Sequence, residues 1–168
     1  RIIIKIGSAL LFNETSGSLN KEWLNSLAED VKYLRENDKE VIIVSSGAIA
    51  MGAKDLDLDM KNMKMDMNQA VSAVGQIHLM GSFKSAFEKN EIKISQILLT
   101  LDDTEQRRRS INARRTIDTL LKLGIVPVVN ENDTIATSEI RYGDNDRLAS
   151  RVAQITSADC LILYLIHI

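Results

Sequence analysis

Short apolar runs alternate with longer helical patterns along the chain. The runs are continuous rather than alternating, they are rich in β-branched residues, and they span residues 2–6, 41–44, 97–101, 125–129 and 160–166. Continuous apolarity is typical of strands whose two faces are both covered, as in a parallel sheet flanked by helices. The pattern therefore predicts five strands of a mostly parallel sheet.

The segments between these runs have the spacing of amphipathic helices. One apolar stripe predicts a helix of roughly sixteen residues that Asn20 caps, and its members are Leu24, Leu27, Ala28, Val31 and Leu34. Further helices are predicted over 68–89, over 104–123 with Gly124 at its end, and from about Asp146 onward. This alternation indicates an α/β fold with right-handed crossovers and a site at the carboxyl ends of the strands.

Residues 54–67 interrupt the alternation. Asp, Lys and Met recur there without a clear helical or strand period. We interpret the segment as a mobile excursion whose methionines fill gaps where the loop folds back. The alternative is that these methionines line a partner surface.

Composition narrows the class of protein. The 168 residues are 45% apolar and 26% charged, which suits one domain or one large lobe, and no apolar run approaches the ~18 residues of a membrane span. The net charge of −2 favours neither nucleic acid nor a membrane as partner. Cys160 is the single cysteine, so we expect a reducing cytoplasm and a small buried side chain at this position, with a reactive thiol as the alternative.

A basic run is the main argument for a different class, a nucleic-acid-binding module. Its members are Arg107, Arg108, Arg109, Arg114 and Arg115. On a helix these positions spread around more than one face, no aromatic residue is interleaved for base stacking, and neighbouring acidic residues offset the charge. A solvated or subunit-facing helix is therefore favoured.

The first candidate for chemistry is Lys5. A lysine in an apolar strand is costly to bury alone, so we expect it at the strand's end facing an anion. Gly7 then lets the backbone pass close to that anion, and Ser8 can donate to it. An edge-strand lysine that reaches solvent is the alternative.

The second candidate is the turn after the second strand. Ser45, Ser46 and Gly47 precede small residues suited to a helix start, where free backbone N–H groups bind carboxylate or phosphate. Gly47 and Gly52 have the spacing of a P-loop. The lysine and the Ser or Thr that a P-loop requires do not follow, so this motif is rejected.

Two later loops concentrate acidic and amide side chains. The first follows a buried strand and contains Asn130, Glu131, Asn132 and Asp133. The second precedes an apolar-periodic helix and contains Asp144, Asn145 and Asp146. Asx-turns and helix capping explain some of these residues, but not so many together.

In this order, the segments resemble the amino acid kinase family, and within it the glutamate 5-kinases. The matching stretches cover nearly the whole chain: KIGS from Lys5, SSGAIAMG from Ser45, AVGQ from Ala73, QILLT from Gln96, NAR from Asn112, VPVVNENDT from Val126 and GDNDRLA from Gly143. The succession of SSGAIA, NEND and GDND is the most specific part. A related kinase for N-acetylglutamate or another amino acid is the alternative, which a substrate panel would separate.

The resemblance implies a three-layer αβα sandwich with glutamate in the N-terminal lobe and ATP mainly on the C-terminal lobe. Residues 1–168 would then be the amino acid kinase domain, mainly its glutamate-binding lobe. The implied reaction uses ATP with Mg²⁺ to phosphorylate the side-chain carboxylate of L-glutamate, giving glutamyl 5-phosphate in the first step of proline synthesis. Proline as a feedback inhibitor and a homo-oligomer are implied as well.

Residue roles follow from the same resemblance. Lys5 matches the lysine that stabilises the transferring phosphoryl group, and Asp146 matches the aspartate that organises the catalytic lysines. Positions that belong to the glutamate site are Ser46, Gly47, Asn130, Asp133, Asp144 and Asn145. No metal ligand is assigned to the chain, since Mg²⁺ would arrive with the nucleotide.

The chain departs from the family after Leu163. The family continues with a Ser/Thr-Asp pair, a glycine-rich stretch and a second catalytic lysine, whereas residues 164–168 read Tyr, Leu, Ile, His, Ile. We therefore expect that most of the nucleotide-binding part is missing here and that these residues alone turn ATP over weakly or not at all.

Overall fold

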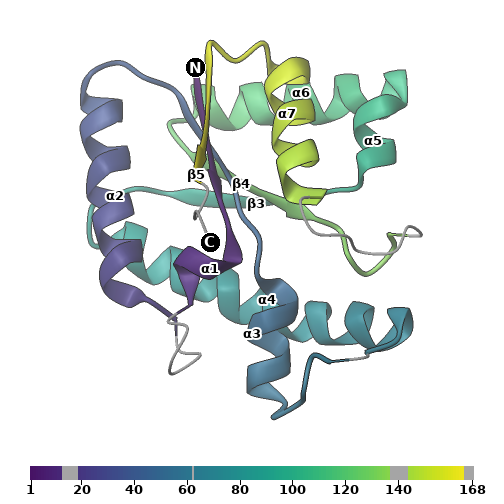
Figure 1. The fold of residues 1–168 in the computed structure, drawn as a ribbon. Coiled ribbons are helices and arrows are strands. Elements are labelled where there is room, and N and C mark those ends of the chain that lie inside the picture. Colours follow the sequence, from purple (N-terminus) through teal and green to yellow (C-terminus); the bar gives the residue numbers. More distant parts are fainter. Residues whose placement is uncertain (13–18, 62, 137–143, 165–168) are drawn as a thin grey trace.

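Five parallel strands form one sheet in the order β3-β4-β2-β1-β5 (Figure 1). The computed structural model describes residues 1–12, 19–61, 63–136 and 144–164. The strands are β1 (Ile2–Ile6), β2 (Val41–Val44), β3 (Ile94–Leu99), β4 (Val126–Glu131) and β5 (Cys160–Tyr164). The parallel sheet that the apolar runs predict is confirmed. Because all strands run the same way, their carboxyl ends share one edge.

Helices cover both faces of the sheet and complete three layers. One layer contains α1 (Ser8–Leu11), α2 (Lys21–Glu36), α3 (Ala48–Asp55) and α4 (Met65–Glu88); the other contains α5 (Leu101–Glu105), α6 (Arg107–Lys122) and α7 (Asp144–Thr156). Asn20 caps α2 as predicted, accepting a hydrogen bond from the Trp23 N–H at 3.1 Å. None of the helices in the described ranges is long and apolar enough to cross a membrane.

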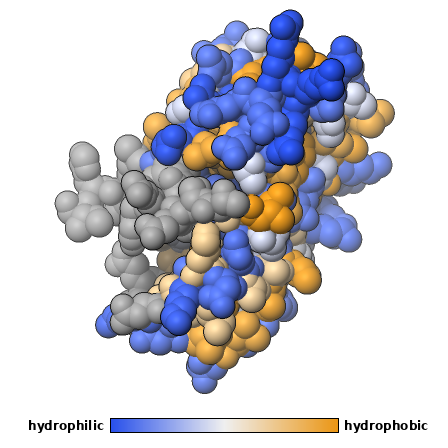
Figure 2. All heavy atoms as spheres, turned by 90° about the vertical axis from the view of Figure 1, so that its right-hand side faces the viewer, coloured by the Kyte–Doolittle hydropathy of each residue, from blue (hydrophilic) through white to orange (hydrophobic). Residues whose placement is uncertain are grey.

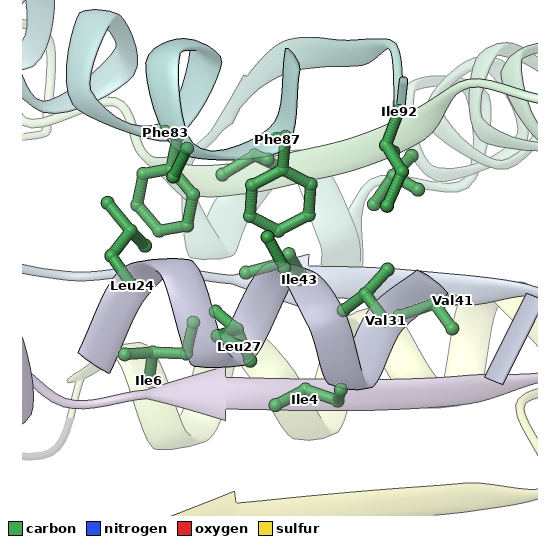
Figure 3. Packing of buried hydrophobic residues seen from close by; sticks show 14 of the residues in the cluster. Ile4, Ile6, Leu24, Leu27, Val31, Val41, Ile43, Phe83, Phe87 and Ile92 are labelled. Carbon is green, nitrogen blue, oxygen red and sulfur yellow. The ribbon is translucent and has the colours of Figure 1, made fainter. Parts of the chain in front are cut away.

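Each central strand feeds two hydrophobic cores by alternation. In β1, Ile4 and Ile6 face α2 and α4, while Ile3 faces α6 and α7. Figure 3 shows the first core, where Phe83 and Phe87 of α4 lie over the strands opposite side chains of α2. Alternation also decides where polar residues point: Lys5 shares the face of Ile3.

Several predicted boundaries are wrong. Strand β4 runs to Glu131, so Asn130 and Glu131 end the strand and do not belong to the loop after it. The strand expected over 97–101 is β3, Ile94–Leu99, and it ends earlier because Thr100 forms a capping box with Asp103 that starts α5. The helix expected over 104–123 is divided at Gln106 into α5 and α6. Helices α3 and α4 take up both ends of the segment 54–67, which leaves residues 56–64 as the connection. Its mobility stays a prediction.

The expectation for Cys160 is also wrong, because its side chain is exposed. It belongs to β5, which lies at the edge of the sheet beside β1. Ile162 and Leu163 in the same strand are 41% and 40% exposed. An apolar run predicts a strand but does not reveal whether another layer covers it, and here the sheet order decides.

Candidate active site

An ion pair between the buried Lys5 and the partly exposed Asp146 lies at the carboxyl end of β1. Lys5 is 8% exposed, and its Nζ lies 2.5 Å from Oδ1 of Asp146 in the first turn of α7. The approach is that of a close ion pair rather than of a well-directed hydrogen bond. A charge this deeply buried requires an opposite partner. Lys5 therefore faces a carboxylate of the chain and does not reach solvent, whereas its contact with a bound phosphate beside Gly7 and Ser8 stays a prediction.

A chain of amides joins α4, β4 and α7. Asn130 Nδ2 donates to Gln76 Oε1 at 2.8 Å. Asn145 Nδ2 donates to the carbonyl of Ser45 at 3.0 Å and lies 3.4 Å from Asn130 Oδ1. The alternation along β4 directs Asn130 to the α4 side of the sheet, which is why its amide meets Gln76.

Asp133 lies beside α4 in the loop after β4. Its Oδ2 accepts a hydrogen bond from Ser72 Oγ at 2.6 Å, and the residue is 9% exposed. Gln69, three residues before Ser72, donates to the carbonyl of Ala136 at 3.0 Å. One face of α4 thus holds the loop that carries Asp133 by two side-chain hydrogen bonds.

The turn after β2 brings Ser46 and Gly47 to the same edge. Ser46 Oγ donates to the carbonyl of Ile6 at 2.8 Å, which ties the end of β2 to the end of β1 and leaves the oxygen able to accept. Gly47 precedes α3 with φ +101°, a conformation that L-side chains rarely adopt. A Cβ there would also lie 2.8 Å from the ring of Phe12.

Two glycines let α3 and α4 cross with their backbones in contact. A Cβ on Gly75 would lie 1.8 Å from the carbonyl oxygen of Ala48, and one on Gly52 would lie 1.9 Å from that of Val71. Gly75 directly precedes Gln76 in α4. The close crossing therefore holds the start of α3 next to the polar face of α4.

The remaining predicted residues lie at this edge or partly outside the described residues. Gly7 precedes α1, and Ser8 is exposed in its first turn directly beyond β1. Asp144 begins α7, but its side chain is not among the described ones. The basic residues of α6 are exposed, and two of them pair with carboxylates: Arg109 with Asp103 and Arg114 with Asp118.

Figure 2 shows hydrophilic residues gathered over the upper part of one face, where Figure 1 places α5 and α6. The ion pairs of Arg109 and Arg114 neutralise part of the positive charge of α6, which agrees with the interpretation of α6 as a solvated helix. No group of three or more His, Cys, Asp or Glu side chains could hold a metal ion among the residues that the structure describes.

Sequence reasoning missed Ser72 and Gln76 as site residues. Both are buried polar side chains in α4, four positions apart and hence on one face of the helix. The available signal was polar residues on an otherwise apolar helix face, within and just before the stretch AVGQ. That signal does not reveal what they contact, because their partners are 61 and 54 residues away in the sequence.

The described edge of the sheet thus combines a buried cation, carboxylates and oriented amides. The model of the amino acid kinase family matches residues 1–165. The chain belongs to the amino acid kinase family. Among solved structures, the isopentenyl phosphate kinase of T. acidophilum in its product complex is similar with a TM-score of 0.63 at 13% identity, over 96% of this chain and 68% of that one. This likeness confirms the α/β fold of the family.

Relatives within the amino acid kinase family are much more similar in sequence. The glutamate 5-kinase of Pelagibacter ubique is 62% identical over 162 residues, which are 96% of this chain and 44% of the relative. The glutamate 5-kinase of Rhodospirillum rubrum is 54% identical over 161 residues, 96% of this chain and 43% of the relative. The chain therefore spans less than half the length of these curated relatives.

Proposed function

We propose that this chain forms the glutamate-binding lobe of a glutamate 5-kinase, which phosphorylates the side-chain carboxylate of L-glutamate to give glutamyl 5-phosphate. The observation that carries the proposal is the ion pair of the buried Lys5 with Asp146, 2.5 Å apart at the edge where the amide chain of Asn130 and Asn145 ends. The names and the 62% and 54% identities of the two relatives support glutamate over N-acetylglutamate as the substrate.

The proposed reaction needs positive charge rather than a general base. A glutamate side chain has an ordinary pKa near 4.3, so the attacking carboxylate is ionised at neutral pH. Repulsion between this carboxylate and the phosphate is then the main obstacle, and fixed cations and donors offset it. Lys5 is the buried cation of this edge, and Asp146 holds its ammonium at the end of β1.

The substrate side of the edge offers groups of both polarities. Asp133, held by Ser72, is suited to accept from the α-ammonium group of glutamate, and Asp144 would stand beside it. Ser46, Gly47, Asn130 and Asn145 lie at the same edge. The second hydrogen of Asn130 Nδ2 and the backbone N–H groups at the start of α3 are donors that suit carboxylates. These roles form the proposed glutamate site.

ATP would reach the same edge from the side of β1. Lys5 fits the transferring phosphate in charge, and the chain at Gly7 and Ser8 fits it as a donor-bearing turn directly beyond the strand. Mg²⁺ that arrives with the nucleotide would supply charge neutralisation there. We further propose a cytoplasmic homo-oligomer whose activity proline inhibits and which starts proline synthesis.

The test is a substrate panel on the protein at its full natural length. We expect ADP release that depends on L-glutamate, with a product that hydroxylamine traps as a hydroxamate, and much slower release with N-acetyl-L-glutamate or L-aspartate. Faster ADP release with N-acetyl-L-glutamate than with L-glutamate would show that N-acetyl-L-glutamate is the substrate. No ADP release with any of these carboxylates would contradict the proposed kinase activity.

A further inference from the structure

The amide of Gln76 is buried and only half satisfied. The side chain is 9% exposed, and its Oε1 accepts the hydrogen bond from Asn130 Nδ2. Its Nε2 is also buried and has no hydrogen-bond partner among the residues that the structure describes. Leaving a buried donor unpaired costs about 1–3 kcal/mol, so natural proteins rarely keep one without a reason.

The neighbouring backbone determines which end of this amide is unpaired. The N–H of Glu131 donates to Asn130 Oδ1 at 2.9 Å, and a backbone N–H can only donate. Asn130 must therefore turn its Nδ2 toward Gln76, and the Gln76 atom that accepts this hydrogen bond must be Oε1. Exchanging the two ends of the Gln76 amide would put donor against donor. The unpaired end is thus an NH₂ group and not a carbonyl.

The position of this donor matches one part of an amino acid. Gln76 follows Ser72 by one turn of α4, and Ser72 holds Asp133, the proposed acceptor for the α-ammonium group. A donor on the same helix face, one turn further along, suits a carboxylate of the same molecule. Asn130, which Gln76 contacts directly, belongs to the proposed glutamate site.

We propose that Gln76 is a substrate-binding residue whose Nε2 donates to a carboxylate oxygen of the bound amino acid. This inference rests on the proposed function, because it takes glutamate as the ligand. Glutamate has two carboxylates, and both have the chemistry that the donor requires. The bound substrate completes the hydrogen bonding of Gln76, so discrimination against ligands without a carboxylate at this point follows from the cost of leaving Nε2 unpaired.

Gln76→Glu tests the donor without disturbing the structural hydrogen bond. The glutamate side chain has the same shape and still accepts from Asn130, but it presents an oxygen where the NH₂ group was. We expect KM for L-glutamate to rise about 10- to 100-fold, the equivalent of a lost hydrogen bond to a charged group, while KM for ATP changes less than about 2-fold. Glutamate binding without ATP, measured by calorimetry, should weaken by the same factor.

The pH dependence of the variant gives a second readout. The introduced carboxyl group, once protonated, carries an O–H that can donate, so the ratio of the variant's KM to the wild-type KM should fall as the pH is lowered. Gln76→Met is the matched control for a purely structural role, because it removes both hydrogen bonds at similar size. An unchanged KM in Gln76→Glu together with an impaired Gln76→Met would show that Gln76 only orients Asn130, and would overturn the proposal.

A glutamate analogue separates the two carboxylates. In isoglutamine the α-carboxylate is an amide and the side-chain carboxylate is intact. If the KM penalty of Gln76→Glu disappears with isoglutamine, Nε2 binds the α-carboxylate; if the penalty stays, it binds the side-chain carboxylate.

A wild-type structure with bound L-glutamate decides the matter if Gln76→Glu does not fold. Nε2 is expected within about 3.2 Å of a carboxylate oxygen. Bound glutamate that leaves Nε2 unpaired overturns the inference alone. Absent glutamate binding and absent turnover in the wild type overturn the proposed function as well, so the two failures are distinguishable.

Discussion

Lys5 and Gln76 illustrate how single residues define this edge of the sheet. Each is buried, and each carries polar atoms that are costly to bury. Lys5 has a carboxylate partner within the chain, whereas one end of Gln76 has none among the described residues. Lys5 is therefore a cation that Asp146 holds in position, and Gln76 carries a donor without a partner among the described residues.

Replacing Lys5 by Met should remove catalysis more than binding. Loss of one group that stabilises charge in a transition state costs about 10²–10³-fold in kcat, and we expect a loss of this size with KM for glutamate changed only a few-fold. Steady-state kinetics on the full-length protein measures both. Lys32→Met, at an exposed position of α2, is the control. A kcat within about 3-fold of the wild type in Lys5→Met would remove Lys5 from the catalytic machinery.

At the scale of elements, the crossing of α3 and α4 and the start of α5 shape the site and its surroundings. The backbones of α3 and α4 touch at Gly52 and Gly75, and this contact sets where Gln76 lies. The capping box of Thr100 and Asp103 ends β3 and starts α5 within a single residue. Both features depend on local backbone geometry that the apolar pattern alone does not encode.

Gly75→Ala should severely destabilise the protein. The added Cβ would lie 1.8 Å from a backbone oxygen, so the two helices would have to move apart. We expect the free energy of unfolding to fall by about 3 kcal/mol, the upper end of the usual loss at an overpacked site, because the added atom meets rigid backbone. Gly81→Ala in the same helix meets nothing within 4 Å and should be neutral or stabilising by up to about 1 kcal/mol. Denaturant unfolding measures both; equal effects would contradict the close crossing.

Asp103 makes part of the stability depend on pH. Burial alone would raise its pKa, but hydrogen bonds from the backbone and side chain of Thr100 and the nearby Arg109 outweigh this and lower the pKa. Because the pKa of Asp103 is lower in the folded state, the ionised carboxylate contributes to the free energy of unfolding. This contribution is fully present above the unfolded-state pKa near 3.9 and is lost as the pH falls through the lower folded-state pKa. The pH window therefore lies below about 4.

Asp103→Asn should cost about 1 kcal/mol of unfolding free energy at pH 7, the usual loss for a helix cap. The difference from the wild type should shrink as the pH falls below about 4. Urea unfolding at several pH values measures it. Asp102→Asn removes the same charge at an exposed neighbouring position and should cost less. A difference in unfolding free energy that persists unchanged to about pH 3 would argue against an ionised Asp103 in the capping box.

At the scale of the whole molecule, one sheet holds two helical layers together. Ile3 and Ile4 are neighbours in β1 but belong to different cores, so each central strand couples the layers. The proposed site lies where both layers meet the strand ends, with Gln76 and Ser72 from one layer and Asp146 from the other. A substitution that destabilises either core should therefore destabilise the shared sheet.

Leu79→Ala and Leu148→Ala test this coupling with identical chemistry in the two layers. Both side chains are fully buried, one in α4 and one in α7, and each truncation should cost about 2–5 kcal/mol. Hydrogen exchange, followed peptide by peptide, should show reduced protection of β1 and β2 in both variants. Loss of protection confined to the layer that carries the substitution would mean that the layers unfold separately.

By itself, the sequence determined which segments become strands and helices and which polar residues stand after the strands. Continuous apolar runs, periodic stripes and the cap at Asn20 are local signals, and they predicted β1, β2 and α2 closely. It also carried the family resemblance, through motifs that follow one another in order.

Only the tertiary structure decided which side chains meet. The contacts of Ser72 with Asp133 and of Gln76 with Asn130 join residues 61 and 54 positions apart, and they depend on the strand order and on the crossing of α3 and α4. The exposure of Cys160 depends on the place of β5 at the sheet edge. Periodicity fixes the face on which a side chain lies, whereas its partner is set by how the elements pack.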